Sequence, residues 1–113
     1  MSTTDLPTIH LHDNLTGKRQ ELRTLEPGKC GFYCCGPTVY DLTHLGNARA
    51  ALVPDVMVRF LRHQGYEVKY VRNITDIDDR IITRAMETGT PAEEIAARFT
   101  AEYARDMEVL GNL

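Results

Sequence analysis

The sequence lacks the features that mark membrane-bound and exported proteins. Its 113 residues contain no apolar run that approaches the roughly 20 residues of a membrane-spanning helix. The first seven residues carry neither a basic segment nor an apolar core, so they lack the pattern of a signal peptide. We therefore expect a cytoplasmic protein that has no membrane partner.

Cysteine and net charge are also low, and each excludes a class of protein. The three cysteines, Cys30, Cys34 and Cys35, are odd in number and two are adjacent, so we expect reduced thiols rather than a disulfide framework. The net charge of −3 divides into 11 basic and 10 acidic side chains over residues 1–85, and 2 basic and 6 acidic ones over residues 86–113. No block is basic enough to predict nucleic-acid binding from electrostatics alone.

The overall composition is typical of a globular chain, with 42% hydrophobic and 26% charged residues. Length alone predicts one small domain. Alternating polarity, a central turn and a returning segment predict a small β-hairpin within residues 1–28. A run rich in Phe, Tyr and Cys over residues 29–35 then predicts a buried strand, which Gly36 and Pro37 must end.

The hydrophobic period then changes to that of a helix. Residues 45–64 place apolar side chains at spacings of three and four, which predicts a helix with one apolar face. The members of that face are Leu52, Val53, Val56, Met57, Phe60 and Leu61. Pro54 predicts a kink or a later start, because proline inside a helix removes a hydrogen bond and costs about 3 kcal/mol. Residues 67–73 are rich in β-branched and aromatic side chains and predict a second strand.

Two further helices are expected towards the carboxyl end. One covers residues 78–88 and is ended by Gly89. The other is expected to open with Thr90 as the N-cap of a capping box and with Pro91 as the first helical residue. Its apolar stripe comprises Ile95, Phe99, Tyr103, Met107 and Leu110.

The order strand, helix, strand, helix, helix predicts an α/β fold. A strand–helix–strand unit of this length joins two parallel strands by a right-handed crossover. In open sheets of this kind, ligands bind beyond the carboxyl ends of the strands. Those ends carry residues 35–38 and 73–76, so we expect the functional site there.

Residues 44–47 (HLGN), at the start of the long helix, form the first candidate site. A helix N-terminus has unpaired N–H groups and a positive dipole end, which suit a phosphate. Gly46 would let a flat group approach the backbone, while His44 and Asn47 can donate hydrogen bonds to phosphate oxygens. The alternative is that Asn47 or Thr43 caps the helix and His44 is a surface side chain, since both common phosphate-loop fingerprints are absent.

Cys35 is the second candidate, as a thiolate that could ligate zinc or act as a nucleophile. Neighbouring residues of a strand face opposite sides, so Cys34 and Cys35 should not serve one ion, and no further Cys or His spacing completes a site. The alternative is that all three cysteines are small buried hydrophobes.

Two weaker patterns complete the candidates. The acidic run at residues 76–79 is not a calcium loop, because Ile81 stands where such a loop needs glycine, so acids at a helix N-terminus are the simpler interpretation. His10 and His12 share one face of a strand, which is a weak pattern for metal binding.

Taken together and in this order, the motifs resemble the amino-terminal part of cysteinyl-tRNA synthetases, which are class I aminoacyl-tRNA synthetases. The resemblance runs from about Ile9 to the last residue. It is carried by residues 32–41 (FYCCGPTVYD), residues 44–49 (HLGNAR) and, most specifically, residues 70–81 (YVRNITDIDDRI). It implies a Rossmann-like nucleotide-binding fold, with residues 29–113 as the first half of the catalytic domain and residues 1–28 as a hairpin extension.

The resemblance also implies a two-step ligase. ATP, accompanied by Mg²⁺, and cysteine give cysteinyl-adenylate and pyrophosphate, and the cysteinyl group then passes to tRNA-Cys. His44, Gly46 and Asn47 match the ATP-binding motif. His44 and Asn47 would have catalytic roles, and Asn47 stands where the family more often has histidine.

Gly36, Thr38 and Thr75 are implied by the same resemblance to line the cysteine pocket. Cys35 matches the first ligand of a zinc ion that binds the thiolate of the substrate. Such an ion favours a thiolate over a serine hydroxyl, so selection for cysteine rests on a metal–sulfur bond.

Several parts of the family's chain do not occur here: the other zinc ligands, a Lys-Met-Ser-Lys-Ser motif and a tRNA-binding helical domain. Because a zinc site needs about four ligands, Cys35 alone cannot hold one, and we expect an amino-terminal fragment that is inactive alone. It is a truncated chain, a fragmentary gene product or one half of a split enzyme that a carboxyl-terminal portion complements. The alternatives are the related ligase that couples cysteine to an amino-sugar in mycothiol synthesis, and a non-catalytic remnant that binds nucleotide or a partner.

Overall fold

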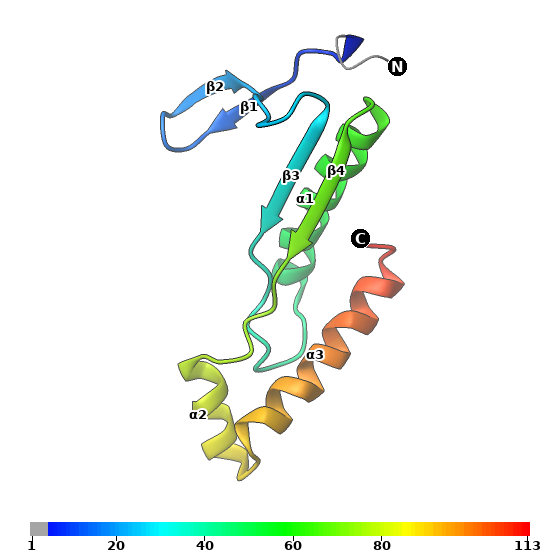
Figure 1. Ribbon diagram of the computed structural model, residues 1–113. Helices are drawn as coiled ribbons and strands as arrows, with labels where there is room; N and C mark the ends of the chain where they lie inside the picture. The colour runs from blue at the N-terminus through cyan, green and yellow to red at the C-terminus, as the bar shows by residue number, and fades with distance from the viewer. Residues whose placement is uncertain (1–4) are drawn as a thin grey trace. The chain divides into compact units, whose positions relative to one another are not determined.

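The computed structural model describes residues 5–113 as four strands and three helices (Figure 1). They follow the chain as β1 (His10–Asp13), β2 (Lys18–Glu21), β3 (Lys29–Cys34), α1 (Leu45–His63), β4 (Glu67–Arg72), α2 (Asp79–Thr88) and α3 (Ala92–Val109). The chain divides into two compact units. One comprises Met57–Tyr70 and the described part of Met1–Phe32, and the other comprises Tyr33–Val56 and Val71–Leu113.

The predicted hairpin is present as β1 paired antiparallel with β2. Asp13 and Gly17 close its turn through a 2.8 Å hydrogen bond from the Gly17 N–H to the Asp13 carbonyl, and Gly17 has a φ of 67° that glycine adopts without strain. A second bond, from the Leu22 N–H to the Ile9 carbonyl at 2.7 Å, extends the pairing. Whether residues 1–28 form a separate extension stays a prediction.

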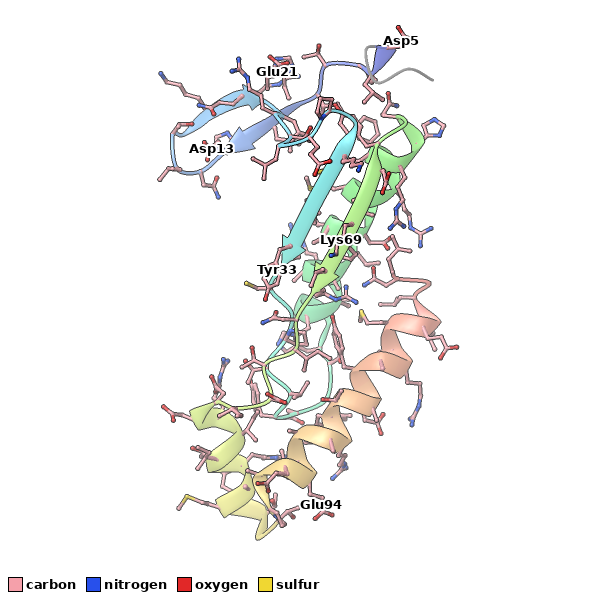
Figure 2. All side chains as sticks on the ribbon, viewed as in Figure 1. Asp5, Asp13, Glu21, Tyr33, Lys69 and Glu94 are labelled. Carbon is pink, nitrogen blue, oxygen red and sulfur yellow. The ribbon has the colours of Figure 1, made fainter. Side chains whose placement is uncertain are left out.

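The predicted strand–helix–strand unit is also present, with β3 and β4 as parallel neighbours and α1 between them in the chain (Figure 1). Alternate side chains of the strands reach the core of the first unit, which consists of Ile9, Cys30, Val58, Leu61 and Val68. On the opposite face, Tyr33 and Lys69 are exposed (Figure 2). Two parallel strands are the start of an α/β sheet, and they do not by themselves make a complete Rossmann-like fold.

Helix α1 buries a different face from the one the spacing predicts. Of the predicted members, Leu61 is buried, but Val53, Val56 and Phe60 are 57%, 64% and 48% exposed. The buried stripe instead contains Ala51, Pro54, Asp55, Val58 and Leu61. The helix begins at Leu45 and runs through Pro54, so the later start predicted as an alternative is wrong. Small Ala51 is buried with Tyr103 and Met107 of α3, whereas Val58 and Leu61 are buried in the core of the first unit.

Helix α2 begins one residue later than predicted, at Asp79, and ends at Thr88 as predicted. Asp78 is its N-cap, and its carboxylate accepts the Arg80 backbone N–H at 2.8 Å. Gly89 ends the helix with a φ of 67°, in the left-handed region.

Helix α3 starts one residue later than predicted, which corrects the proposed capping box. Pro91, with an extended backbone, is the N-cap, and no side chain caps the helix. The predicted stripe is confirmed for Ile95, Phe99, Tyr103 and Met107, which are buried, but Leu110 is 46% exposed. Leu110 is the C-cap, so the stripe ends one turn earlier than predicted.

Candidate functional site

The segments that follow β3 and β4 continue to pair beyond the strands. The Gly36 N–H donates to the Asn73 side-chain oxygen at 2.6 Å. Farther on, Thr38 and Thr75 form a parallel bridge, in which the Thr75 N–H donates to the Pro37 carbonyl at 2.9 Å. Of the three residues predicted to line a cysteine pocket, Thr38 and Thr75 are therefore paired with each other, and Gly36 is bonded to Asn73 just before that bridge.

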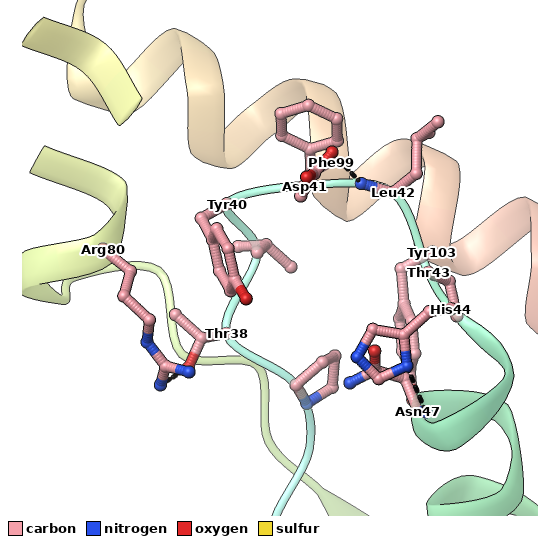
Figure 3. A pocket seen from close by; sticks show the side chains of 12 residues that line it. Thr38, Tyr40, Asp41, Leu42, Thr43, His44, Asn47, Arg80, Phe99 and Tyr103 are labelled. Atoms are coloured by element: carbon pink, nitrogen blue, oxygen red, sulfur yellow. Dashed lines mark hydrogen bonds between the residues drawn. The ribbon is translucent and has the colours of Figure 1, made fainter. Parts of the chain in front are cut away.

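A pocket of about 330 Å³ opens beside these paired segments, within the second unit (Figure 3). Its walls are formed by Pro37, Thr38, Val39, Tyr40, Asp41, Leu42, Thr43, His44, Asn47, Arg80, Phe99 and Tyr103. Figure 3 shows Arg80 and Thr38 on one side of the pocket and His44 with Asn47 on the other. Three predicted site residues therefore line one pocket, whereas Gly46 and Thr75 do not line it.

His44 is the side chain that caps helix α1, so the alternative assignment of the cap to Asn47 or Thr43 is wrong. The Asn47 backbone N–H donates to His44 Nδ1 at 3.2 Å, and the His44 carbonyl accepts from the Ala48 N–H at the same distance. An Nδ1 that accepts has no proton, so in the neutral ring Nε2 carries the hydrogen and can donate. A Cβ on Gly46 would lie 3.0 Å from His44 Cε1, so glycine leaves room for the imidazole.

Arg80 is a pocket residue to which the sequence motifs assigned no role. Its Nε donates to Asp78 Oδ1 at 3.0 Å and its Nη2 donates to Thr38 Oγ1 at 3.1 Å. The guanidinium carbon also lies 5.2 Å from the centre of the Tyr40 ring. These three contacts hold a permanent positive charge at the pocket wall.

The charges around Arg80 reinforce one another. Hydrogen bonds from the Arg80 backbone N–H and then from its side chain hold the pKa of the Asp78 carboxyl below its ordinary value. The Asp78 carboxylate in turn raises the pKa of the Arg80 guanidinium. Asp78 therefore works as a helix cap and as the partner of Arg80, which supports the simpler interpretation of the acidic run.

Replacing Asp78 with asparagine should lower the melting temperature by a few degrees at about pH 6, because asparagine keeps the cap but loses the charge. A carboxyl whose pKa is lowered by folding stabilises the protein above its unfolded pKa, here 3.8, and loses that effect as the pH falls through the folded value. The difference in melting temperature between the two proteins should therefore shrink as the pH falls below 3.8. A difference that stays constant as the pH is lowered contradicts this account.

The cysteines occupy three different environments. Cys30 is buried in the core of the first unit, where desolvation raises the pKa of its thiol, so the prediction of a small buried hydrophobe is confirmed for this residue. Cys34 is half-buried, and Cys35 is exposed. Cys35 lines a smaller cavity of about 60 Å³ together with Gly36.

Within residues 5–113, no three His, Cys, Asp or Glu side chains lie close enough together to hold a metal ion. Cys35 is thus a single ligand, and neither it nor the pair His10 and His12 makes a metal site from this chain's described residues. No helix among these residues is both long enough and apolar enough to cross a membrane.

Comparison with known proteins supports the motif assignments at the level of the family. Residues 21–113 match the family described as tRNA synthetases class I (C), catalytic domain. The chain is 53% identical over 105 residues to the cysteine–tRNA ligase of Anaeromyxobacter sp. (strain Fw109-5), which covers 93% of this chain and 22% of that protein. It is 52% identical over 105 residues to the cysteine–tRNA ligase of Syntrophobacter fumaroxidans, covering 93% of this chain and 21% of the relative.

The chain therefore spans about a fifth of the length of the curated relatives that it matches. A third relative, the cysteine–tRNA ligase of Geobacter sulfurreducens, gives the same proportion, with 52% identity over 103 residues and 21% of its length covered. The family match covers most of the chain. It includes both strands of the parallel pair, all three helices and every residue that lines the pocket of about 330 Å³. The chain belongs to the family of class I (C) tRNA synthetase catalytic domains.

Proposed function

We propose that this chain is the amino-terminal part of a cysteine–tRNA ligase and contributes to ATP-dependent activation of cysteine and its transfer to tRNA-Cys. The observation that carries the proposal is the identity of 52–53% to ligases of that name, over 93% of the chain. Residues 29–113 would form the first half of a Rossmann-like catalytic domain, with residues 1–28 as a hairpin extension. The cytoplasm, where charged tRNA is used, is the proposed location.

We assign ATP, with its Mg²⁺, to the pocket of about 330 Å³. The His44 Nε2–H and the Asn47 side chain would donate to phosphate oxygens there, and the capped start of α1 adds its dipole and the unpaired N–H groups around Gly46. These donors would already be oriented before ATP binds, so they would stabilise the negative charge that develops on the phosphate oxygens in the transition state.

Cysteine is assigned to the adjoining segment, where Cys35 and Gly36 line the smaller cavity and Thr38 and Thr75 are paired beside it. The zinc ion that the family implies would bind the thiolate of the substrate. Since Cys35 is the only potential ligand at this place among the described residues, the chain does not fit zinc by itself, and the remaining ligands must come from a complementing portion.

The exposed face of α1 supports the existence of such a portion. Val53, Val56 and Phe60 expose between 48% and 64% of their surface on one helix. An apolar face of this kind is ordinarily covered in the complete protein. The relatives are several times longer than this chain, so residues able to cover it exist in the family.

The decisive experiment measures cysteine-dependent ATP–pyrophosphate exchange. The chain is assayed alone and after mixing with a polypeptide that covers the remaining length of the Anaeromyxobacter ligase. We expect exchange and bound zinc in the mixture only, with serine giving no exchange. Exchange by the chain alone would overturn the need for a partner, whereas no exchange in any mixture would favour a remnant that binds nucleotide or a partner without catalysis.

A further inference from the structure

The pocket of about 330 Å³ has one permanently cationic side chain in its wall. Of the described residues that line this pocket, Arg80 alone carries such a charge, and Asp41 is the one carboxylate. Asp41 Oδ1 accepts the Leu42 N–H at 2.8 Å and lies 4.0 Å from Arg84 Nη2, so its negative charge is partly offset. Arg80 is therefore the side chain of this wall that can attract an anion.

Arg80 is accessible and held in place at the same time. Its side chain is 59% exposed and lines the pocket, so a ligand there can reach it. Bonds to Asp78 and Thr38, together with the Tyr40 ring, fix its orientation. The two bonds use two of the five N–H donors of a guanidinium, and neither uses Nη1. A fixed arginine that keeps donors loses little further freedom when it binds an anion.

Thr38 locates this cation relative to the two substrates. It lines the pocket assigned to ATP, and it is paired with Thr75 in the segment assigned to cysteine. Its Oγ1 accepts from Arg80 Nη2 at 3.1 Å. The guanidinium therefore lies where a ligand of the pocket would approach a ligand of the adjoining segment. In the activation of an amino acid, the part of ATP that meets the amino acid is the α-phosphate.

We propose that the Arg80 guanidinium binds the α-phosphate of ATP, from the wall of the pocket opposite His44 and Asn47 (Figure 3). This inference deepens the proposed function and rests on it. Phosphate oxygens are the acceptors that the fork of an arginine fits best, together with carboxylates.

The contact fits the chemistry of activation. One carboxylate oxygen of cysteine forms a bond to the α-phosphorus, while the bond from that phosphorus to the bridging oxygen breaks and its electron pair leaves with pyrophosphate. An anion thus attacks an anionic centre. Donors from Arg80 to the other α-phosphate oxygens would offset the repulsion and stabilise the charge of the transition state. Arg80 transfers no proton in this step.

A purely structural brace is the competing explanation, because Arg80 ties Thr38 to the cap of α2. Asp78→Asn distinguishes the two explanations. Asparagine still accepts from Arg80 Nε but has no charge, so it leaves the guanidinium more available to an anion. Affinity for a phosphate should therefore stay the same or rise if Arg80 binds it. It should fall, as it does for Arg80→Gln, if Arg80 is only a brace.

The first test titrates the folded, ¹⁵N-arginine-labelled chain with AMP and with adenosine, which differ by one phosphate, and follows the Arg80 side-chain signals by NMR. We expect AMP to bind roughly tenfold more tightly than adenosine and to shift these signals. Arg80→Gln should remove most of the difference, and Arg80→Lys, which keeps the charge, should retain part of it. Arg105→Gln removes an exposed arginine paired with Glu102 at 3.1 Å; it is the control and should change neither affinity.

Three results of the titration would overturn the inference. One is AMP that binds no more tightly than adenosine, or Arg80 signals that stay still up to roughly 100 mM AMP, where even millimolar binding would saturate. Another is weaker binding of AMP to Asp78→Asn. The third uses inorganic pyrophosphate as a further probe. If Arg80→Gln weakens the binding of pyrophosphate and leaves that of AMP unchanged, the cation contacts the leaving group instead of the α-phosphate.

A second measurement separates the inference from the proposed function. In the reconstituted exchange assay, Arg80→Gln should lower kcat by roughly 10²- to 10³-fold and leave KM for cysteine nearly unchanged. An unaltered rate overturns the role of Arg80 while the proposed function stands. Absence of exchange in the unmodified mixture rejects the proposed function, while the titration still decides the phosphate contact.

Discussion

Replacing Gly36 with alanine is expected to destabilise the chain by about 3 kcal/mol or more, at or beyond the upper end of what overpacking usually costs. A Cβ on Gly36 would overlap the carbonyl oxygen of Asn73, lie 2.9 Å from the Asn73 carbonyl carbon and lie 3.3 Å from Arg72 Cγ. Two of these three neighbours are backbone atoms, which cannot swing away. Relief therefore requires the segments after β3 and β4 to separate, and that breaks the 2.6 Å bond from the Gly36 N–H to Asn73.

Gly31→Ala is the matched control. Gly31 lies within β3, whereas Gly36 lies just after it, and a Cβ on Gly31 meets no atom within 4 Å. Alanine in a strand interior should be neutral or stabilising by up to about 1 kcal/mol. Urea unfolding followed by circular dichroism measures both variants. Equal urea midpoints for the two variants would show that the segments after β3 and β4 can separate at little cost, which contradicts the close approach of Gly36 to Asn73.

The elements of this fold are predictable from the sequence because local signals mark them strongly. Gly89 ends α2 as expected, since a left-handed glycine acts within one turn of the helix, and the start of α2 lies within one residue of the prediction because Asp78 is its N-cap. Parallel pairing of β3 and β4 was predictable from the long helical connection between them, because antiparallel neighbours can be joined by a short turn and parallel neighbours cannot.

What the sequence could not decide is which face each helix buries and how α3 begins. Helix α1 has apolar side chains on more than one side, so periodicity favoured the bulky residues Val53, Val56 and Phe60. The structure instead buries small Ala51, because Tyr103 and Met107 pack there. That partner lies about 50 positions away in the chain, which is beyond the reach of local periodicity. Thr90 had the right residue type for a cap, but the extended Pro91 takes the position without a side-chain bond.

The sequence motifs predicted where several pocket-lining residues meet, but they did not predict the contacts of the long side chains there. The rule that ligands bind beyond the carboxyl ends of parallel strands pointed to residues 35–38 and 73–76, and Thr38 from the first of these segments lines one pocket together with His44 and Asn47 of the separate helix-start motif. Arg80 was passed over, although it lies in the most specific motif, because its role depends on where a long side chain ends. The contacts of Arg80 with Thr38 and Tyr40 exist only after folding has placed partners from another segment.

Replacing His44 with asparagine is expected to lower the rate of cysteinyl-adenylate formation by roughly 10²- to 10³-fold in the reconstituted enzyme, the usual effect of removing one donor to the transition state. Asparagine can accept the Asn47 backbone N–H as His44 Nδ1 does at 3.2 Å, so the cap on α1 survives. The hydrogen on Nε2, which the cap directs away from the helix backbone, is lost. Stability should therefore stay nearly constant while the rate falls.

His44→Ala separates the two contributions of the ring. It removes the cap as well as the donor, so it should cost about 1 kcal/mol of stability in addition to the same loss of rate. Pyrophosphate exchange at saturating ATP and cysteine gives the rate, and urea unfolding of each variant gives the stability. If asparagine at position 44 supports exchange at the rate of the unmodified chain, the imidazole acts only as a cap, and the phosphate contact must be assigned to the helix N–H groups and Asn47 instead.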